Sequence, residues 1–258
     1  MSFKEKLFPF AGYPLLFGHR GCSAVAPENT IAAFQKILDH RIPGVELDIQ
    51  IARTGELVVC HDSNLKRTTG KDALIRETDL DEIRSLDAGS WFSPDFSGEG
   101  IPLLDEVLDL LGNEVYYDIE IKHWDRDGGE LERKAVETIQ RRGIRERTLL
   151  SSFNPYSVKA VRRLDPTLHT AHIYTRHTGF PWYLSTGAGR LICRPEVLKP
   201  NRHRINSWSV FWKKRVLRYP LVAWTEDDLE AARRYLELGV DGIITNVPEQ
   251  MLSIVTGR

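Results

Sequence analysis

Residues 44–51 read Gly-Val-Glu-Leu-Asp-Ile-Gln-Ile, a run with the pattern of a buried strand that carries two acidic side chains. Side chains two positions apart on a strand lie on the same face, so Glu46 and Asp48 aim at one common point. The residues between and beside them are apolar. Burying two carboxylates in this way costs several kcal/mol unless a metal ion or a counter-charge compensates. The run therefore predicts a core strand with an ionised site on one face.

Three further ionisable pairs lie next to short apolar runs in the same way. They are His19-Arg20, His61-Asp62 and Glu120-x-Lys122. Glu120 joins Glu46 and Asp48 as a third clustered carboxylate. The predicted strand ends therefore carry three such carboxylates, two histidines and two cations. This combination indicates a metal-assisted phosphate-ester site, and argues against a structural ion-pair network.

Outside these pairs the chain alternates short apolar runs with amphipathic stretches, a pattern typical of an α/β fold with a parallel sheet. The predicted strands are 15–18, 44–51, 114–121, 148–152, 169–174, 190–193, 221–224 and 242–245. The predicted helices are 30–38, 104–111, 130–141, 155–164, roughly 206–217, 227–238 and a last one that begins at Pro248. Eight such repeats in 258 residues predict a TIM (β/α)8 barrel, which places its chemistry at the carboxyl ends of the strands.

One connection departs from this alternation. A Thr54-Gly55 turn follows the second strand and leads into a return strand at 56–60. The polar stretch that follows, about 63–100, is too long for an ordinary loop and contains a short helical pattern near 81–86. We therefore expect a single domain spanning 1–258, with a small insertion after the second strand that lies beside the active face.

Composition narrows the classes of partner. The chain has 35 basic and 36 acidic residues, so no general nucleic-acid or membrane field is expected. No segment reaches the roughly 20 apolar residues of a transmembrane helix. Lys4 and Lys6 precede an uncharged run at 7–18 that resembles a short secretion signal, but Pro9 and Pro14 interrupt it and no cleavage site follows. Three widely spaced cysteines (Cys22, Cys60 and Cys193) fit reduced, buried thiols, and cytoplasmic localisation is expected.

A resemblance makes the expected chemistry specific. The runs are FGHRG (17–21), APENT (26–30), GVELDIQ (44–50), VVCHD (58–62), DIEIK (118–122), AWT (223–225) and DGIITNVPE (241–249). In this order they resemble the glycerophosphodiester phosphodiesterase family, a TIM-barrel group of phospholipase C-like phosphodiesterases, over nearly the whole chain. Two departures are that Asp118 stands where the family often has Asn, and that Glu226-Asp227 follows Thr225 where a Val-Asn pair is common.

The resemblance implies a role for each site residue. His19 and His61 would form the acid–base pair, and Glu46, Asp48 and Glu120 would bind one divalent cation. Arg20 and Lys122 would clamp the phosphate. Trp224 would form a wall of the glycerol pocket, although core packing is an equal reading of this residue. The implied reaction is hydrolysis of glycerophosphodiesters to glycerol 3-phosphate and an alcohol.

The residue chemistry agrees with this assignment. Three carboxylates without a ligating cysteine or histidine suit Mg²⁺ or Ca²⁺ and disfavour zinc. One histidine would deprotonate the attacking oxygen and the other would protonate the leaving alkoxide, in either order. The attacking oxygen is either water or a neighbouring hydroxyl of the substrate, which would give a cyclic phosphate.

Three other functions are compatible with parts of this pattern. The first keeps the site and hydrolyses lysophospholipids, as a lysophospholipase D does. The second stabilises an enolate on Mg²⁺. Such sites use a single lysine or histidine base, whereas this chain has a pair of histidines beside an arginine. The third is a non-catalytic ligand-binding barrel, against which the intact histidine pair argues.

Basic residues concentrate in 190–218, where nine occur with one acidic residue. Trp208, Phe211 and Trp212 stand at helical spacing within the same segment. We favour the interpretation that these aromatic residues pack against the barrel while the basic heads stay solvated. The alternative is peripheral contact of this segment with an anionic membrane surface.

Overall fold

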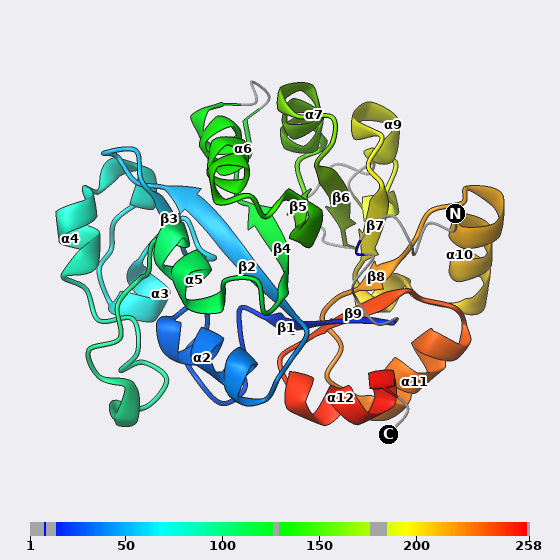
Figure 1. Ribbon diagram of the computed structural model, residues 1–258, viewed down its shortest axis with the longest axis horizontal. Helices are drawn as coiled ribbons and strands as arrows, with labels where there is room; N and C mark the ends of the chain where they lie inside the picture. Colours follow the sequence, from blue (N-terminus) through cyan, green and yellow to red (C-terminus); the bar gives the residue numbers. More distant parts are fainter. Residues whose placement is uncertain (1–7, 9–13, 126–128, 176–184, 257–258) are drawn as a thin grey trace.

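Eight parallel strands form a nearly closed barrel in the computed structural model, which describes residues 8, 14–125, 129–175 and 185–256 (Figure 1). The strands are β1 (Leu15–His19), β2 (Gly44–Ile51), β4 (Tyr116–Ile121), β5 (Thr148–Ser152), β6 (His169–Tyr174), β7 (Val197–Pro200), β8 (Val222–Ala223) and β9 (Gly242–Thr245). Their order is β7-β6-β5-β4-β2-β1-β9-β8. Parallel bridges from Leu198 to Leu221 and from Asn201 to Trp224 join the two end strands. The predicted barrel is confirmed.

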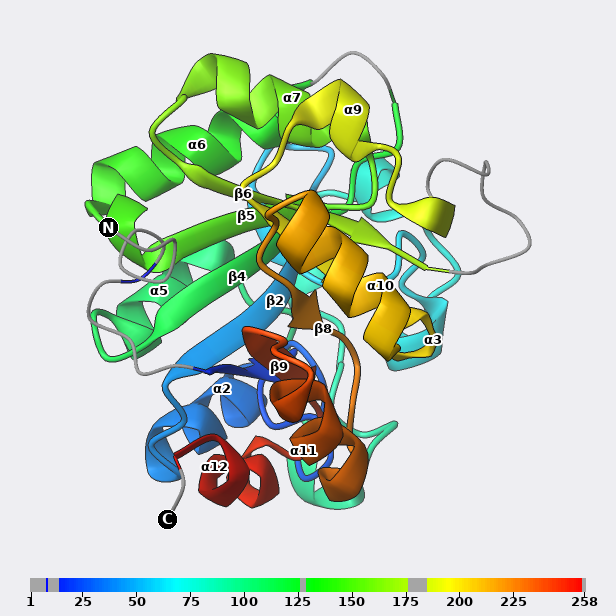
Figure 2. The same ribbon diagram turned by 90° about the vertical axis from the view of Figure 1, so that its right-hand side faces the viewer.

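Helices ring the strands, as two views at right angles show (Figures 1 and 2). They are α2 (Ile31–Asp39), α5 (Leu104–Leu111), α6 (Glu130–Arg142), α7 (Pro155–Leu164), α9 (Arg190–Cys193), α10 (Ser207–Phe211), α11 (Leu229–Glu237) and α12 (Pro248–Thr256). Side-chain caps fix several helix starts, because an oxygen at the N-cap satisfies a free backbone N–H. Thr30 caps α2, Asn154 caps α7 and Asp228 caps α11.

The two faces of the barrel wall have different cores. Val45, Leu47 and Ile49 point outward into the main hydrophobic layer beneath the helices. Leu15 and Phe17, with neighbours from other strands, fill the barrel interior below the charged residues. This alternation leaves the inner face of each strand free to carry polar groups near its carboxyl end.

The insertion lies at the left in Figure 1. The return strand β3 (Leu57–Val59) pairs antiparallel with β2 and leads into the insertion, which contains α3 (Lys66–Thr69), α4 (Leu80–Arg84) and 3-10 turns at Ile75–Glu77 and Pro94–Phe96. It has a small apolar core of its own, to which Val58, Leu65, Ile75 and Ile83 belong.

The prediction of the sixth barrel strand is wrong. Residues 190–193 form helix α9, and the strand is Val197–Pro200. The run Val-Leu-Lys-Pro argues against a central strand, because a proline cannot donate to a sheet and a lysine is seldom buried. Lys199 is nevertheless buried, since Asp118 on the inner face of β4 provides its counter-charge.

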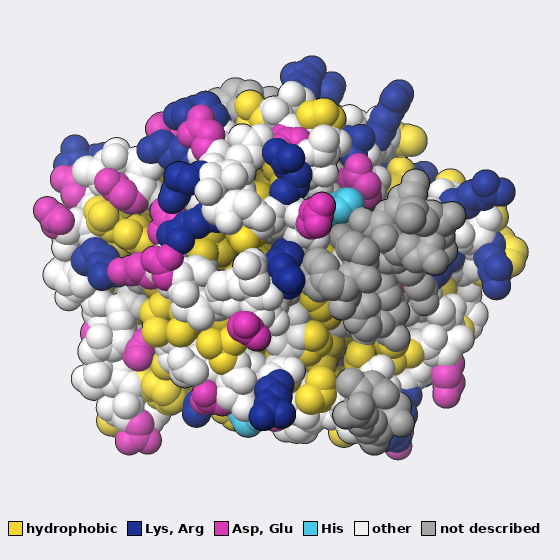
Figure 3. Space-filling view, in the orientation of Figure 1, with side chains coloured by type: hydrophobic (Ala, Val, Ile, Leu, Met, Phe, Trp, Pro, Cys, Tyr) yellow, Lys and Arg dark blue, Asp and Glu magenta, His cyan; other side chains and the backbone are white. Residues whose placement is uncertain are grey.

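The helix expected at about 206–217 begins as α10 and continues as a π-helical turn, Trp212–Val216. The packing favoured for its aromatic residues is also wrong, because Trp208 is 70% exposed, Phe211 53% and Trp212 44%. Figure 3 shows hydrophobic and basic side chains together at its right-hand edge, over α10.

Two further sequence expectations concern a secretion signal and a membrane-spanning helix. Lys4, Lys6 and Pro9, on which the reading of the first residues depends, lie outside the described residues. Within the described part of the chain, no helix combines the length and the apolar character needed to cross a bilayer.

Candidate active site

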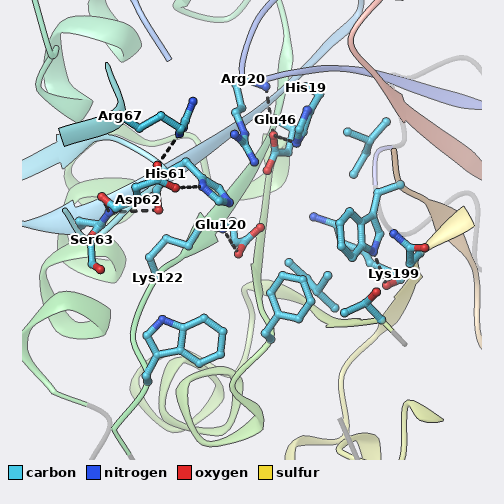
Figure 4. A pocket seen from close by; sticks show the side chains of 18 of the residues that line it. His19, Arg20, Glu46, His61, Asp62, Ser63, Arg67, Glu120, Lys122 and Lys199 are labelled. Carbon is cyan, nitrogen blue, oxygen red and sulfur yellow. Dashed lines mark hydrogen bonds and ion pairs between the residues drawn. The ribbon is translucent and has the colours of Figure 1, made fainter. Parts of the chain in front are cut away.

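A cavity of about 890 Å³ opens at the carboxyl ends of the strands. Its walls include most of the predicted site residues: His19, Arg20, Glu46, His61, Glu120, Lys122 and Trp224. Figure 4 shows these charged side chains converging, with Glu46 between His61 and His19 in that view. The eighth predicted residue, Asp48, is buried beside the cavity and contacts two of the residues that line it. The fold therefore brings all eight together.

The three carboxylates meet because β2 and β4 pair in register. Asp48 lies beside Glu120 in the sheet, and Glu46 is on the same inner face. One oxygen from each of the three falls within 4.8 Å of the others, and all three side chains are buried. Within the described residues, this cluster offers an all-oxygen donor set of the kind that suits a hard divalent cation.

The surroundings of the cluster shift the pKa values of Asp48 and Glu46 in opposite directions. Lys122 Nζ lies 3.0 Å from Asp48 Oδ1 and 2.5 Å from Glu120 Oε1, and Arg20 Nε lies 3.2 Å from Asp48 Oδ2. These cations outweigh the effect of burial and hold the pKa of Asp48 well below its usual range. Burial and the nearby Asp48 raise the pKa of Glu46 well above its usual range. A bound divalent cation would stabilise Glu46 as a carboxylate, so the residues present fit such a cation.

Arg20 is held by a tight loop between β1 and α2. Its backbone has a φ of 55°, in the left-handed region that is uncommon for residues other than glycine. Gly21 follows at a φ of 86°, and a Cβ there would lie 2.7 Å from the backbone of Ala33. This conformation points the Arg20 backbone N–H at Glu46 Oε2, 3.1 Å away, while its guanidinium binds Glu28 at 2.7 Å.

Asn29 in this loop binds the carboxylate cluster and does not cap the helix that follows. Thr30 is the N-cap of α2, whereas Asn29 donates from Nδ2 to Asp48 Oδ2 at 2.9 Å. The backbone of Asn29 is also left-handed, with a φ of 58°. The loop therefore fixes Asp48 from two sides, through Arg20 and through Asn29.

His19 is oriented by a chain of hydrogen bonds from β9. Asn246 donates from Nδ2 to Asp227 Oδ2 at 2.7 Å, which turns its Oδ1 toward His19. His19 Nδ1 lies 2.7 Å from that oxygen, so Nδ1 carries the hydrogen and Nε2 is free to accept a proton. Burial, followed by the charge of Arg20, lowers the pKa of His19 to about 3 and keeps the ring neutral.

His61 has a carboxylate partner instead of an amide. Its Nδ1 lies 2.7 Å from Asp62 Oδ1, and Arg67 of α3 binds the other oxygen of that carboxylate. Arg67 also makes two hydrogen bonds to Glu28, the residue that holds Arg20. The insertion thus positions both His61 and Arg20.

Beneath the carboxylates lies a fully buried ion pair. Lys199 Nζ is 2.6 Å from Asp118 Oδ2 and donates to Ser151 Oγ at 3.0 Å. Ser151 in turn donates to the other oxygen of Asp118 at 2.7 Å. Asp118, the departure noted in the sequence, is therefore paired within the barrel and belongs to a network next to the proposed metal ligands.

An aromatic wall closes one side of the cavity. The ring of Trp224 meets that of Phe153 edge-on, with centroids 5.4 Å apart, and the ring of Trp124 stacks on Phe153 with centroids 6.3 Å apart. Trp224 is fixed by a hydrogen bond from Nε1 to the Lys199 carbonyl oxygen, 2.9 Å away. This residue is thus placed to contact a ligand while it also packs.

Sequence reasoning missed four residues of this site. Asp227 was placed at the start of a predicted helix, Asn246 at the turn after the last strand, and Arg67 in the polar insertion, with no site role for any of them. The signal for Lys199 was present in Asp118, because a second acidic side chain on the inner face of β4 needs a buried counter-charge. No pattern along the chain identified which strand supplied it.

Known proteins match this chain over most of its length. A model of the glycerophosphoryl diester phosphodiesterase family matches residues 19–250. A glycerophosphodiester phosphodiesterase of Caldanaerobacter subterraneus is 35% identical over 93% of this chain and 97% of its own length. One from Bacillus subtilis is 28% identical over 94% of this chain and 87% of its own length.

Solved structures agree with these sequences. A phosphodiesterase of Oleispira antarctica, solved with its product sn-glycerol-3-phosphate, has a TM-score of 0.83 and 26% identity, and covers 94% of this chain and 96% of that one. A structure from Silicibacter pomeroyi has a TM-score of 0.85 at 24% identity, covering 99% and 97% of the two chains, and supports the fold alone.

Proposed function

Because this chain belongs to the glycerophosphoryl diester phosphodiesterase family and is a glycerophosphodiester phosphodiesterase, we propose that the cavity cleaves its substrate by histidine acid–base catalysis beside one divalent cation. The products would be glycerol 3-phosphate and an alcohol. The observation that carries this proposal is that His19 and His61 line the same cavity as a cluster of three buried carboxylates. The Oleispira antarctica relative, whose structure holds sn-glycerol-3-phosphate as product, supports the same outcome.

Glu46, Asp48 and Glu120 would hold the cation, either Mg²⁺ or Ca²⁺. When bound, such a cation supplies positive charge to the phosphate oxygens. Arg20 and Lys122 would bind the same oxygens, an assignment supported by their positions in the cavity wall and next to Asp48. Their fixed positive charges would stabilise the negative charge that builds on the phosphate in the transition state.

The different partners of the two histidines support a division of roles. His61 is hydrogen-bonded to the Asp62 carboxylate, which stabilises an imidazolium and therefore suits a general acid. His19 is hydrogen-bonded to the Asn246 amide, which fixes the tautomer without favouring a positive charge, and it therefore suits a general base.

These roles define the proton transfers and the bonds that form and break in the reaction. His19 Nε2 takes the proton of the attacking hydroxyl or water as its oxygen forms a bond to phosphorus. The bond from phosphorus to the alcohol oxygen breaks, and His61 gives its Nε2 proton to the departing alkoxide. If the substrate's own hydroxyl attacks, this step leaves a cyclic phosphate, which water then opens to glycerol 3-phosphate, with His61 taking the proton of the water and His19 giving its proton to the ring oxygen that leaves. A substrate whose neighbouring hydroxyl is methylated separates the two routes, because it reacts only when water is the nucleophile.

The aromatic wall favours a second substrate class. Trp124, Phe153 and Trp224 give a cavity of about 890 Å³ an apolar side, which a lysophospholipid would use for its chain. Hydrolysis of lysophosphatidylcholine faster than glycerophosphocholine would favour this lysophospholipase D-like activity.

The direct test of the proposed function follows choline and glycerol 3-phosphate released from glycerophosphocholine in Mg²⁺, in Ca²⁺ and with a chelator. Release that requires a cation supports the proposal. Release that survives exhaustive chelation contradicts the metal assignment. Binding of the diester without turnover in either metal would instead indicate a non-catalytic barrel.

We also propose that the enzyme is cytoplasmic. Cys22, Cys60 and Cys193 are free and buried, and burial raises the pKa of each thiol to about 12, which keeps them unreactive. Unpaired thiols are typical of a reducing compartment. Cell fractionation followed by immunodetection would test this location.

A further inference from the structure

A second distinctive surface lies away from the carboxylate cluster. We call it the α10 surface, and it consists of Trp208, Phe211, Trp212, Lys213, Arg215, Val216 and Arg218. The ring of Trp208 stacks on those of Phe211 and Trp212, with centroids 6.2 and 6.0 Å apart. Val210 is the buried residue of α10, so the aromatic side chains are not what attaches this helix to the barrel. Three large aromatic side chains gathered on an exposed face are typical of a binding surface.

The second feature of this surface is positive charge without acidic partners among the described residues. In the same segment, Lys214 pairs with Asp241 at 2.7 Å and Lys199 pairs with Asp118. By contrast, within the described part of the chain, no carboxylate lies within ion-pair distance of the cations Arg190, Lys213, Arg215 and Arg218. The surface therefore combines exposed aromatic rings with positive charge that no described acidic residue neutralises.

A recess beside the aromatic rings brings the two features together. It has a volume of about 370 Å³, and Arg190, Ser209 and Lys213 line it together with the indoles of Trp208 and Trp212. Lys213 Nζ lies 5.4 Å from the centre of the Tyr174 ring. Burial lowers the pKa of Lys213 to about 8, and the nearby charges of Arg204 and Arg190 add to that shift. Two cations, Arg190 and Lys213, can bind phosphate oxygens there.

We propose that the α10 surface docks the enzyme on an anionic phospholipid bilayer. Indole rings favour the interface between water and lipid, and unpaired lysine and arginine side chains are attracted to anionic head groups. A recess beside the indoles that two cations line would fit the phosphate of a lipid head group. Charge complementarity and the apolar ridge together favour this partner over an acidic protein, which would use the charges but not the exposed stacked rings.

Docking would also orient the catalytic cavity. The α10 surface belongs to the connection between β7 and β8, which begins at Asn201, a residue that lines the cavity. In Figure 2 α10 faces the viewer, beside β8. The inference goes beyond the proposed function, because membrane binding needs neither the histidines nor a bound cation.

The test is co-sedimentation of the full chain with vesicles of phosphatidylcholine, with and without phosphatidylglycerol. We expect binding to the anionic vesicles at low ionic strength that weakens toward ~0.15 M salt, where charges are screened beyond roughly 8 Å. Arg215→Glu with Arg218→Glu should weaken binding by at least tenfold, since each basic residue contributes about a fivefold effect near anionic lipid. Trp208→Ala with Trp212→Ala should weaken it as well and abolish the fluorescence shift on binding.

The matched control is Lys71→Glu with Arg76→Glu, which makes the same charge change on exposed residues of the insertion and should leave binding unchanged. Turnover of glycerophosphocholine should be the same in all these variants, which shows that they are folded. No binding to anionic vesicles at low ionic strength overturns the proposal. Binding that survives in the α10 variants also overturns it, as does self-association of the free protein that is lost in Trp208→Ala, because a second copy would then cover the surface.

Discussion

Arg67 binds both carboxylate oxygens of Glu28, with Nη1 to Oε2 at 3.0 Å and Nη2 to Oε1 at 2.6 Å. Glu28 also holds the guanidinium of Arg20, and Arg67 also binds Asp62, the partner of His61. One guanidinium from the insertion therefore connects a proposed phosphate clamp to a proposed acid. The insertion between the second strand and α5 thus has a structural reason to lie at the cavity.

Replacing Arg67 tests this connection. Arg67→Ala should lower kcat/KM by roughly 10- to 100-fold, the usual effect of losing a partner that orients a catalytic group. Arg67→Lys should recover little, because an ammonium cannot bind Glu28 in a fork and reach Asp62 as well. Arg76→Ala is the matched control, since Arg76 is an exposed arginine of the insertion that pairs with the exposed Glu77. Equal activity of Arg67→Ala and the control would show that the insertion does not position the site.

Removing the cation or its ligands should cost both activity and stability. We expect Glu46→Gln, Asp48→Asn and Glu120→Gln each to abolish turnover and to weaken binding of Mg²⁺ or Ca²⁺. Wild-type protein should melt at a lower temperature in chelator, because a ligand that binds only the folded state stabilises it. Glu137→Gln on the outer face of α6 is the control. A mutant of the cluster with full activity and unchanged metal affinity would contradict the assignment.

Glu46 gives the metal-free protein a specific pH dependence. Its raised pKa in the folded state means that, above the ordinary glutamate pKa of about 4.3, folded protein keeps a proton that unfolded protein has released. The free energy of unfolding contributed by this group therefore falls as pH rises from that value toward the raised pKa. In chelator, Glu46→Gln should gain stability relative to wild type as pH rises. A difference in melting temperature that does not change with pH would show that Glu46 is ionised in the metal-free protein.

The buried pair of Lys199 and Asp118 should behave as a unit. Lys199→Met or Asp118→Asn alone leaves a buried charge without its partner and should cost ~3–5 kcal/mol of unfolding free energy. The double variant should recover much of that loss, and urea titration of all four proteins measures the coupling. Losses that simply add would mean that the two charges do not depend on each other.

Periodicity and spacing predicted the barrel, its helices and the three carboxylates, since alternation along β2 and β4 is a local property of the chain. The sixth barrel strand, β7, was missed because what permits burial of Lys199 is Asp118, a residue distant in sequence. The exposed aromatic residues of α10 were misjudged for a related reason. Helical spacing shows that Trp208, Phe211 and Trp212 share a face, but not whether that face meets the barrel.

The sequence also did not identify the residues whose hydrogen bonds orient the two histidines. Asn246 and Arg67 act through side-chain hydrogen bonds to residues that are 227 and 5 positions away in sequence, His19 and Asp62 respectively. Even the short separation of Arg67 from Asp62 gave no signal, because an arginine in a polar insertion is ordinarily solvated. The family resemblance supplied the roles of the histidines, while the structure shows which partners could make those roles different.

The most direct measurement of the central claim compares His19→Ala and His61→Ala on glycerophosphocholine and on a diester with a nitrophenolate leaving group. A nitrophenolate leaves without protonation, so the loss of a general acid matters little for it. We predict that His61→Ala recovers most of its activity on the nitrophenyl diester, while His19→Ala stays inactive on both substrates. The reverse pattern would exchange the two roles, and equal failure of both variants on both substrates would contradict acid–base catalysis by this pair.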